Sequence, residues 1–296
     1  MESSSTHDSS LITHHDSPSV SVIIPTYNRR ERVLKAIESV VAQKRQPNEI
    51  IVVDDGSTDG SAAEIQNAFP DITLIRQENS GVSAARNTGI RAVASEWLAF
   101  LDSDDEWKPE KLGKHMAYAL SHPKYRISQT DEVWIRNGCF VNPMKKHGKK
   151  AGRFFRDALK LCLVSPSAVM IHQNVFRDIG YFDQTLPVCE DYDLWLRILA
   201  REQIGFLAEK LVVKHGGHPD QLSLNFIAMD RFRVRAILKI LRFPELVIED
   251  RKDAVAELAE KCHILEQGYA KHGSPERCAR FRWIRETVTG KLDRKV

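Results

Sequence analysis

Short runs of apolar and β-branched residues alternate with segments of helical period over the first hundred residues, and this alternation is the strongest constraint on the fold. The runs are VSVIIP, IIVVDD, ITLI and WLAFLD, which begin at Val20, Ile50, Ile72 and Trp97. Strands that are buried on both faces of a parallel sheet need such continuous apolar runs. The sequence therefore predicts an α/β fold in which helices flank a mostly parallel sheet.

The segments between and after these runs predict the remaining elements. Three of them have the length and apolar spacing of helices, namely Glu31 to Ala42, Thr58 to Ala68 and Val82 to Val93. We expect a further helix over Pro109 to Leu120, with Pro109 in its first turn, and a strand over Arg126 to Arg136. Asn137 to Gly152 is rich in glycine and lysine and is expected to form a solvated loop. A last helix of this part is expected over Asp191 to Arg201.

Composition changes twice along the chain and suggests three parts. Residues 1–19 are rich in Ser, Thr, His and Asp, so they predict a flexible lead. Residues 20–225 carry the alternating pattern. Residues 226–296 contain 16 Lys and Arg against 11 Asp and Glu, which predicts a basic helical appendage. Its apolar stripe at helical spacing comprises Val255, Leu258, Cys262, Leu265 and Tyr269.

Charge and cysteine usage exclude several classes of protein. The chain has 43 Lys and Arg against 40 Asp and Glu, a balance that argues against nucleic acid as a partner. Its five cysteines are scattered and form no CxxC pair, which argues against a disulfide framework and a structural zinc site. We find no signal-peptide pattern and no apolar run of roughly 18 residues, so a cytoplasmic location is expected.

Acidic residues follow two of the predicted strands. Asp102, Asp104 and Asp105 come directly after WLAFL, where closely spaced carboxylates repel one another unless a cation compensates them. Mg²⁺ or Mn²⁺ would do so, and helix capping by these residues is an equal alternative. Asp54 and Asp55 follow the second strand, where a carboxylate can accept from a base or ribose hydroxyl or simply form a turn. The first strand is not followed by GxGxxG, so a dinucleotide-binding fold is disfavoured.

Four motifs taken in order closely resemble those of family 2 glycosyltransferases, which have the GT-A fold. They are PTYNR from Pro25, VVDDGSTDG from Val52, NSGVSAARNTGI from Asn79 and FLDSDDEW from Phe100. The resemblance covers roughly residues 20 to 215 and includes EDYDLWLR from Glu190. It implies a Rossmann-like sheet with a nucleotide-binding half over about 20–107 and an acceptor half over about 108–225.

The resemblance also implies the roles of individual residues. The nucleotide sugar would contact Pro25, Thr26, Tyr27, Arg29, Asp54, Asp55, Arg86, Asp102 and Ser103. Asp104 would be the principal metal ligand, with Asp102 nearer the ribose and sugar. His215 could complete the metal shell or bind the leaving diphosphate, whereas a solvent-facing loop position is equally consistent for His215 and is favoured for His218. Asp191 would be the catalytic base, with Glu190 beside it.

The chemistry of glycosyl transfer independently requires a metal or other cation and a carboxylate base. Departure of a nucleoside diphosphate builds negative charge that a metal can neutralise, and the acceptor hydroxyl needs one carboxylate as a base. A single ED motif suffices for transfer with inversion. A helix start with acidic residues is the plain alternative for Glu190 and Asp191. Processive members of the family add Gln-x-x-Arg-Trp, whereas Ala279 takes the glutamine position here, so transfer of single sugars is favoured.

The sequence thus predicts a metal-dependent, inverting glycosyltransferase. It would move one sugar from a nucleotide diphosphate sugar, expected to be UDP-linked, to a hydroxyl of a saccharide or lipid-linked acceptor in cell-surface polysaccharide biosynthesis. The appendage could mediate a homodimer or a peripheral contact with the inner face of the plasma membrane. A sugar nucleotidyltransferase would favour a glycine-rich loop that PTYNRRER does not provide. A catalytically silent nucleotide-sugar-binding protein would not need Glu190 and Asp191.

Overall fold

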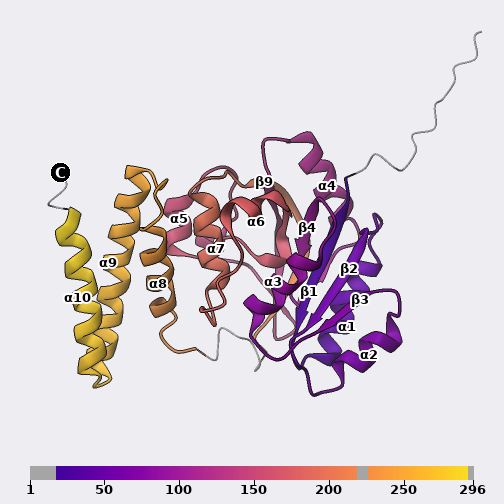
Figure 1. The fold of residues 1–296 in the computed structure, drawn as a ribbon, viewed down its shortest axis with the longest axis horizontal. Helices are drawn as coiled ribbons and strands as arrows, with labels where there is room; N and C mark the ends of the chain where they lie inside the picture. Colours follow the sequence, from indigo (N-terminus) through magenta and orange to yellow (C-terminus); the bar gives the residue numbers. More distant parts are fainter. Residues whose placement is uncertain (1–17, 219–225, 293–296) are drawn as a thin grey trace, which may run out of the picture.

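The computed structural model describes residues 18–218 and 226–292. Most of the predicted flexible lead lies outside these residues. In the described part, nine strands form one sheet in the order β3-β2-β1-β4-β8-β6-β9-β5, with β7 paired to β6. Helices flank this sheet, and three further helices stand at one end of the molecule (Figure 1).

The first half of the sheet is parallel, as the alternating pattern predicts. Strand β1 (Val20–Thr26) pairs with β2 (Glu49–Asp54) and with β4 (Trp97–Phe100), and β2 pairs with β3 (Thr73–Arg76). Every residue of β1 is buried, because helices cover both faces. These helices are α1 (Arg30–Val41), α2 (Ser61–Ala68) and α3 (Val82–Ala92). Helix α2 begins three residues later than predicted, because the Asp59 carboxylate accepts from the backbone N–H of Ser61.

The second half of the sheet is mixed. Strand β8 (Val169–His172) lies antiparallel between β4 and β6 (Ile127–Arg136), and β9 (Gly205–Gly216) runs parallel to β6. The two-residue strand β5 (Glu106–Trp107) closes the edge against β9. Between the strands lie α4 (Lys111–Ser121), α5 (Phe155–Lys160), α6 (Asn174–Ile179) and α7 (Glu190–Leu199).

Two local predictions in this half were wrong. Pro109 precedes α4 instead of forming its first turn. The segment predicted as a solvated loop contains β7 (Cys139–Val141), which pairs with β6, and a 3-10 turn over Lys145–His147. The Lys149 side chain in the same segment is only 4% exposed, and its Nζ forms an ion pair with Glu132 at 3.2 Å. Glu132 of β6 thus allows one lysine of this lysine-rich segment to pack inside the fold.

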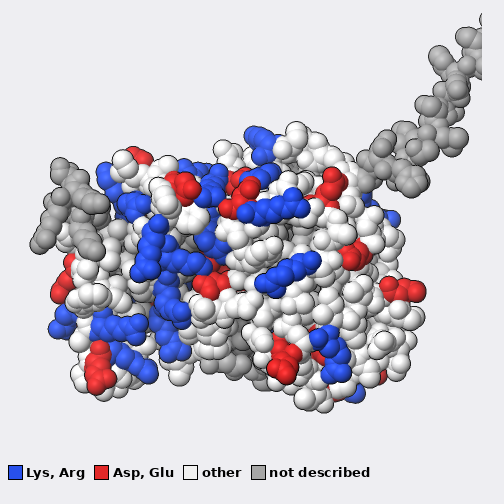
Figure 2. Space-filling model, viewed as in Figure 1, with Lys and Arg blue, Asp and Glu red and all other residues white. Residues whose placement is uncertain are grey.

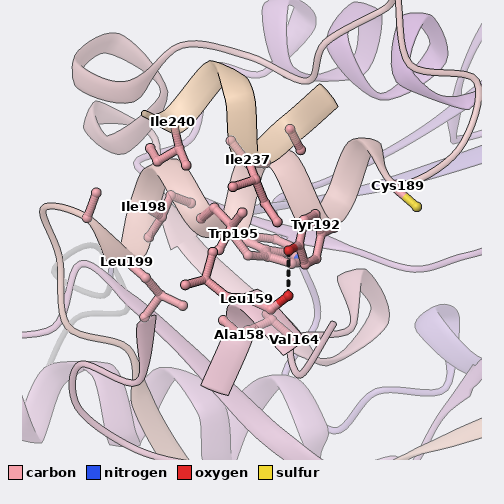
Figure 3. Close-up of a cluster of buried hydrophobic side chains, with 14 of the residues drawn as sticks. Ala158, Leu159, Val164, Cys189, Tyr192, Trp195, Ile198, Leu199, Ile237 and Ile240 are labelled. Carbon is pink, nitrogen blue, oxygen red and sulfur yellow. Dashed lines mark hydrogen bonds between the residues drawn. The ribbon is translucent and has the colours of Figure 1, made fainter. Parts of the chain in front are cut away.

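The basic appendage is helical, as predicted, and its apolar stripe is part of the core. It comprises α8 (Asp230–Ile240), α9 (Ile248–Lys271) and α10 (Pro275–Leu292), which stand together at the end of the molecule opposite β3 (Figure 1). Figure 3 shows Ile237 and Ile240 of α8 beside Tyr192 and Trp195 of α7. Leu258 and Cys262 of α9 belong to the same buried cluster. None of the described helices is long and apolar enough to cross a membrane.

Candidate active site

A cavity of about 920 Å³ lies at the carboxyl ends of β1, β2 and β4. Parallel α/β sheets bind their ligands at this edge. The cavity gathers residues from all the motifs singled out in the sequence. Those of the predicted site that line it are Pro25, Thr26, Tyr27, Arg29, Asp55, Arg86, Asp102, Ser103, Asp104, Glu190, Asp191 and His215.

Asp54 is the predicted site residue that does not line the cavity. Its carboxylate is fully buried and accepts from the backbone N–H of Ser57 at 3.0 Å and from Nε of Arg76 at 3.2 Å. The contacts tie the loop after β2 to β3. The structure therefore places Asp54 in the support of this loop and Asp55 at the cavity wall.

The loops after β1 and β2 are fastened to each other. The backbone N–H of Asn28 donates to Ser57 Oγ at 2.8 Å, and Asn28 Oδ1 accepts from the backbone N–H of Thr58 at 2.8 Å. Asn28 has a positive φ of 49°, which asparagine tolerates better than most residues. These links hold the PTYNR loop against the DGST turn. Thr26 Oγ1 lies buried in the same wall and has no hydrogen-bond partner in the part of the chain that the structure describes.

Asp55 organises the start of helix α3. Its Oδ1 accepts from the backbone N–H of Ser80 at 3.0 Å and from Gln77 Nε2 at 2.7 Å, and its Oδ2 accepts from the backbone N–H of Gly81 at 2.8 Å. Gly81 has a positive φ of 88°, which glycine adopts without strain. Each carboxylate oxygen has two acceptor sites. Oδ2 therefore keeps capacity for one donor from a ligand in the cavity.

Arg86 on α3 joins two motifs that lie far apart in the sequence. Its Nη1 donates to Glu190 Oε1 at 2.6 Å and its Nη2 donates to Asp102 Oδ1 at 2.7 Å. Helix α3 can approach β1 closely because it carries Gly89, where an added Cβ would lie 2.4 Å from Ile23. Both ends of the guanidinium are therefore occupied by carboxylates. The sequence predicted a donor contact for Arg86 and did not foresee this bridge.

The pKa values of the two carboxylates in this bridge shift in opposite directions. Burial alone would raise the pKa of Asp102, but the charges of Arg86 and Lys214 outweigh it and lower that pKa. Burial and the neighbouring Asp191 raise the pKa of Glu190 to about 7, although Arg86 opposes the shift. Asp102 is thus held ionised. Glu190 can exchange a proton near neutral pH.

Asp104 faces two cationic or basic partners. Its Oδ2 lies 3.0 Å from Arg29 Nη1 and 2.9 Å from His218 Nε2. His215, the histidine predicted for the metal shell, contacts Glu106 instead, with Nε2 to Oε1 at 2.9 Å. His215 lies within β9, whereas His218 follows Gly217, whose positive φ of 84° turns the chain after the strand ends at Gly216. Asp102 and Asp104 form the DxD pair of the FLDSDDEW motif, and the imidazole at its second aspartate belongs to His218.

Asp104 and His218 fit a divalent metal of the kind that the motif implies. Carboxylate oxygen and imidazole nitrogen are both suitable ligands for Mn²⁺, and carboxylate oxygen suits Mg²⁺. Among residues 18–218 and 226–292, no group of three or more His, Cys, Asp and Glu side chains is arranged to hold a metal. A metal here would therefore take its remaining ligands from a bound diphosphate and from water.

Lys214 on β9 is a cavity residue that the sequence did not predict. Its Nζ donates to Ser165 Oγ at 3.1 Å. Burial would lower its pKa, but the charges of Asp105, Glu132 and the DxD pair raise it. Burial also raises the pKa of Asp105 well above its usual range. Lys214 is therefore a fixed cation beside the acidic cluster.

Asp191 lies in the first turn of α7 at the opposite wall. Its Oδ1 accepts from the backbone N–H of Tyr192 at 2.7 Å, and its Oδ2 accepts from the Cys162 thiol at 3.3 Å. Burial and Asp191 together raise the pKa of Cys162 well above the usual value, so the thiol keeps its proton. The carboxylate is therefore held in one orientation at the cavity wall, where it can accept a further proton.

The cavity thus combines groups with complementary chemical abilities. Thr26 and Asp55 line the β1–β2 end, Lys214, Asp102 and Asp104 line the part beside β4, and the oriented carboxylate of Asp191 comes from α7. Such an arrangement can bind a nucleoside diphosphate, stabilise its negative charge and deprotonate a hydroxyl.

Comparisons with known proteins agree with this geometry. The model of the Glycosyl transferase family 2 matches residues 21–180. The Escherichia coli protein WfaP, a UDP-Glc:alpha-D-GlcNAc-diphosphoundecaprenol beta-1,3-glucosyltransferase, is 30% identical over 193 residues, which are 62% of this chain and 70% of WfaP. TuaG of Bacillus subtilis strain 168, a putative teichuronic acid biosynthesis glycosyltransferase, is 31% identical over 64% of this chain and 75% of TuaG.

Other relatives and a solved structure extend the comparison. Uncharacterised glycosyltransferases of Rickettsia species are 28% to 32% identical, and the chain spans from 75% to as little as 31% of their lengths. The crystal structure of S. aureus TarS 1-349 in complex with UDP-GlcNAc has the same fold, with a TM-score of 0.65, 19% identity and 92% of each chain covered. From its fold, its motifs and these matches, the chain belongs to glycosyl transferase family 2 and has the GT-A fold.

Proposed function

We propose that this chain is an inverting glycosyltransferase that moves one sugar from a UDP-linked donor to a hydroxyl of a saccharide or lipid-linked acceptor. The observation that carries the proposal is the convergence of the predicted donor residues and the predicted base on one cavity. Asp55 retains an acceptor site for a base, and Asp191 lies across the cavity from it. This arrangement favours transfer over nucleotide binding alone.

The residues of the cavity divide the reaction between them. Lys214 and Arg29 would stabilise the charge that develops on the leaving diphosphate, and Asp191 would take the proton of the attacking hydroxyl. Asp104 and His218 would hold Mg²⁺ or Mn²⁺, which supplies further neutralisation of the diphosphate when bound. Attack from the side opposite the diphosphate would convert an α-linked donor into a β-linked product.

The names of the relatives support a place in cell-surface polysaccharide synthesis. WfaP is named for a UDP-Glc donor, a diphosphoundecaprenol-linked acceptor and a β-1,3 product, and TuaG is named for teichuronic acid biosynthesis. We propose the same class of donor and acceptor here. A location at the cytoplasmic face of the plasma membrane stays a prediction.

A thermal-shift screen of the full chain tests the donor proposal. Ligands that bind only the native state raise its melting temperature. We expect UDP-sugars with Mn²⁺ to raise it by several degrees, and GDP- and dTDP-sugars to have a smaller effect. Proton NMR of the product made with the best donor should report a β anomeric proton. A melting temperature that no nucleotide sugar changes, or an α-linked product from an α-linked donor, would refute the proposal.

A further inference from the structure

Two arginines of helix α8, Arg231 and Arg235, have no acidic partner within the described residues. They lie four residues apart, which places them one turn from each other on the same side of the helix, and we call this pair the arginine stripe. Figure 2 shows a run of Lys and Arg side chains over the surface where Figure 1 draws α8. Like charges one turn apart repel each other. An anion bound along this arginine stripe would relieve that repulsion.

Neighbouring cations of α8 are neutralised within the fold. Arg233 Nη1 lies 2.8 Å from Asp230 Oδ1, and Lys239 Nζ lies 2.8 Å from Asp183 Oδ2 and 3.0 Å from Asp193 Oδ2. Lys239 lies one turn beyond Arg235 on the same side of the helix, so acidic partners reach this side near its end. Within the described residues, no carboxylate forms such a pair with Arg231 or Arg235.

Arg231 has a donor that the described residues leave unused. Its guanidinium lies 4.6 Å from the centre of the Phe232 ring, and its Nε, like that of Arg233, is buried without a hydrogen-bond acceptor among the described residues. A buried N–H without an acceptor costs free energy that a ligand oxygen would recover. Guanidinium groups bind phosphate oxygens in a planar, often bidentate geometry.

The arginine stripe begins at the mouth of the active-site cavity. Phe226 and Met229, which directly precede α8, line that cavity. Arg235 Nη2 donates to Thr185 Oγ1 at 3.3 Å, and Thr185 also lines the cavity. A molecule that reaches Asp191 from this side would therefore pass beside the stripe.

The interior of the cavity repels anions on the acceptor side. Glu190 and Asp191 lie there, and Arg86 beside them is already paired with Glu190 and Asp102. A phosphate attached to an acceptor sugar would be unfavourable beside these carboxylates. We propose that Arg231 and Arg235 bind the diphosphate of a lipid-linked acceptor at the cavity mouth while its sugar hydroxyl reaches Asp191. This rests on the proposed function and names the acceptor class as a diphosphate-bearing lipid.

Binding of geranyl diphosphate, a short lipid diphosphate without a sugar or a nucleotide, tests the inference on the full chain. Isothermal titration should give affinity for geranyl diphosphate and much weaker affinity for geraniol. The variant R231Q/R235Q should bind geranyl diphosphate about 10-fold or more weakly, because two charge-assisted contacts are lost. The control R277Q/R280Q removes the same charge from exposed positions of α10 and should bind like the natural protein.

The outcomes separate this inference from the donor proposal. UDP with Mn²⁺ should bind all variants equally and should not displace geranyl diphosphate. Displacement by UDP would mean that geranyl diphosphate binds in the donor region, and it would overturn the inference. Equal affinity in R231Q/R235Q, or an equal loss in R277Q/R280Q, would also overturn it. If R231Q/R235Q loses binding to phosphatidylglycerol vesicles while its affinity for geranyl diphosphate stays unchanged, the two arginines bind a membrane surface, and the inference is overturned. Failure of UDP to bind at all would refute the donor proposal alone.

Discussion

Replacing Arg86 by methionine should destabilise the protein in a way that depends on pH. Arg86 is 4% exposed and forms short ion pairs with Asp102 and Glu190. Among the described residues, no other cation forms an ion pair with either carboxylate. Removing one partner of a buried ion pair typically costs about 3–5 kcal/mol, because a charge is left uncompensated. Glu190 can avoid part of this cost by taking up a proton.

The pH dependence follows from the pKa of Glu190. Burial and Asp191 raise that pKa to about 7 even with Arg86 present, well above the value near 4.3 expected in the unfolded chain. Loss of Arg86 raises the pKa further, so the native variant keeps its proton above pH 7 while the unfolded chain does not. Stability then falls with rising pH by up to about 1.4 kcal/mol per pH unit. The natural protein should level off above pH 7.

Urea unfolding at pH 6, 7 and 8 measures this difference. The matched control is Arg91→Met, which removes an exposed arginine from the same helix and should change the free energy of unfolding by less than about 0.5 kcal/mol at every pH. Arg86→Met with Glu190→Gln should regain part of the stability and lose the pH dependence above pH 7. The reasoning fails if Arg86→Met costs no more than Arg91→Met, or if its cost is the same at pH 6 and pH 8.

Three further substitutions test other parts of the molecule. Asp191→Asn should lower kcat by roughly 100-fold or more while the Kd of UDP stays unchanged, and near-native kcat would remove Asp191 from the role of base. Asp104→Ala should abolish the Mn²⁺ dependence of UDP binding in isothermal titration with an unaltered circular dichroism spectrum; metal dependence that persists would exclude this ligand. Lys111 is fully buried, and burial lowers its pKa well below the usual value. As pH falls, the unfolded chain binds a proton at Lys111 more readily than the native state does, which lowers the stability of the native state. Lys111→Met should therefore raise the melting temperature more at pH 7 than at pH 10. Equal shifts at the two pH values would contradict the argument.

The parallel half of the fold was predictable because its signals are local. Each of its strands is a continuous apolar run, and each crossover helix has its own apolar face. The second half offers weaker signals. Strand β5 has two residues, too few for any periodicity, and β7 consists of exposed residues whose only strand signal is their pairing with β6. The buried position of the Lys149 side chain depends on Glu132 of strand β6, which no local pattern reveals.

The candidate site was predictable where short motifs carry it and unpredictable where distant residues complete it. Asp104 could be selected from FLDSDDEW, but the choice between His215 and His218 depends on which way each side chain leaves the chain near the end of β9. Lys214 sits in a strand where a lysine predicts exposure to solvent. Its role arises from Asp105 and Asp102, which reach it only through the pairing of distant strands.

The buried cluster that joins the sheet to the appendage has a consequence for biosynthesis. Ile23 of the first strand and Ile284 of α10 belong to this one cluster, together with the side chains of Figure 3. While the ribosome is still synthesising the chain, α5 and α8 lack the apolar cover that α9 later supplies. Unfinished chains with such surfaces are prone to aggregate and to engage chaperones. Fragments that end before α9 should therefore be recovered as insoluble protein, and not as a smaller enzyme.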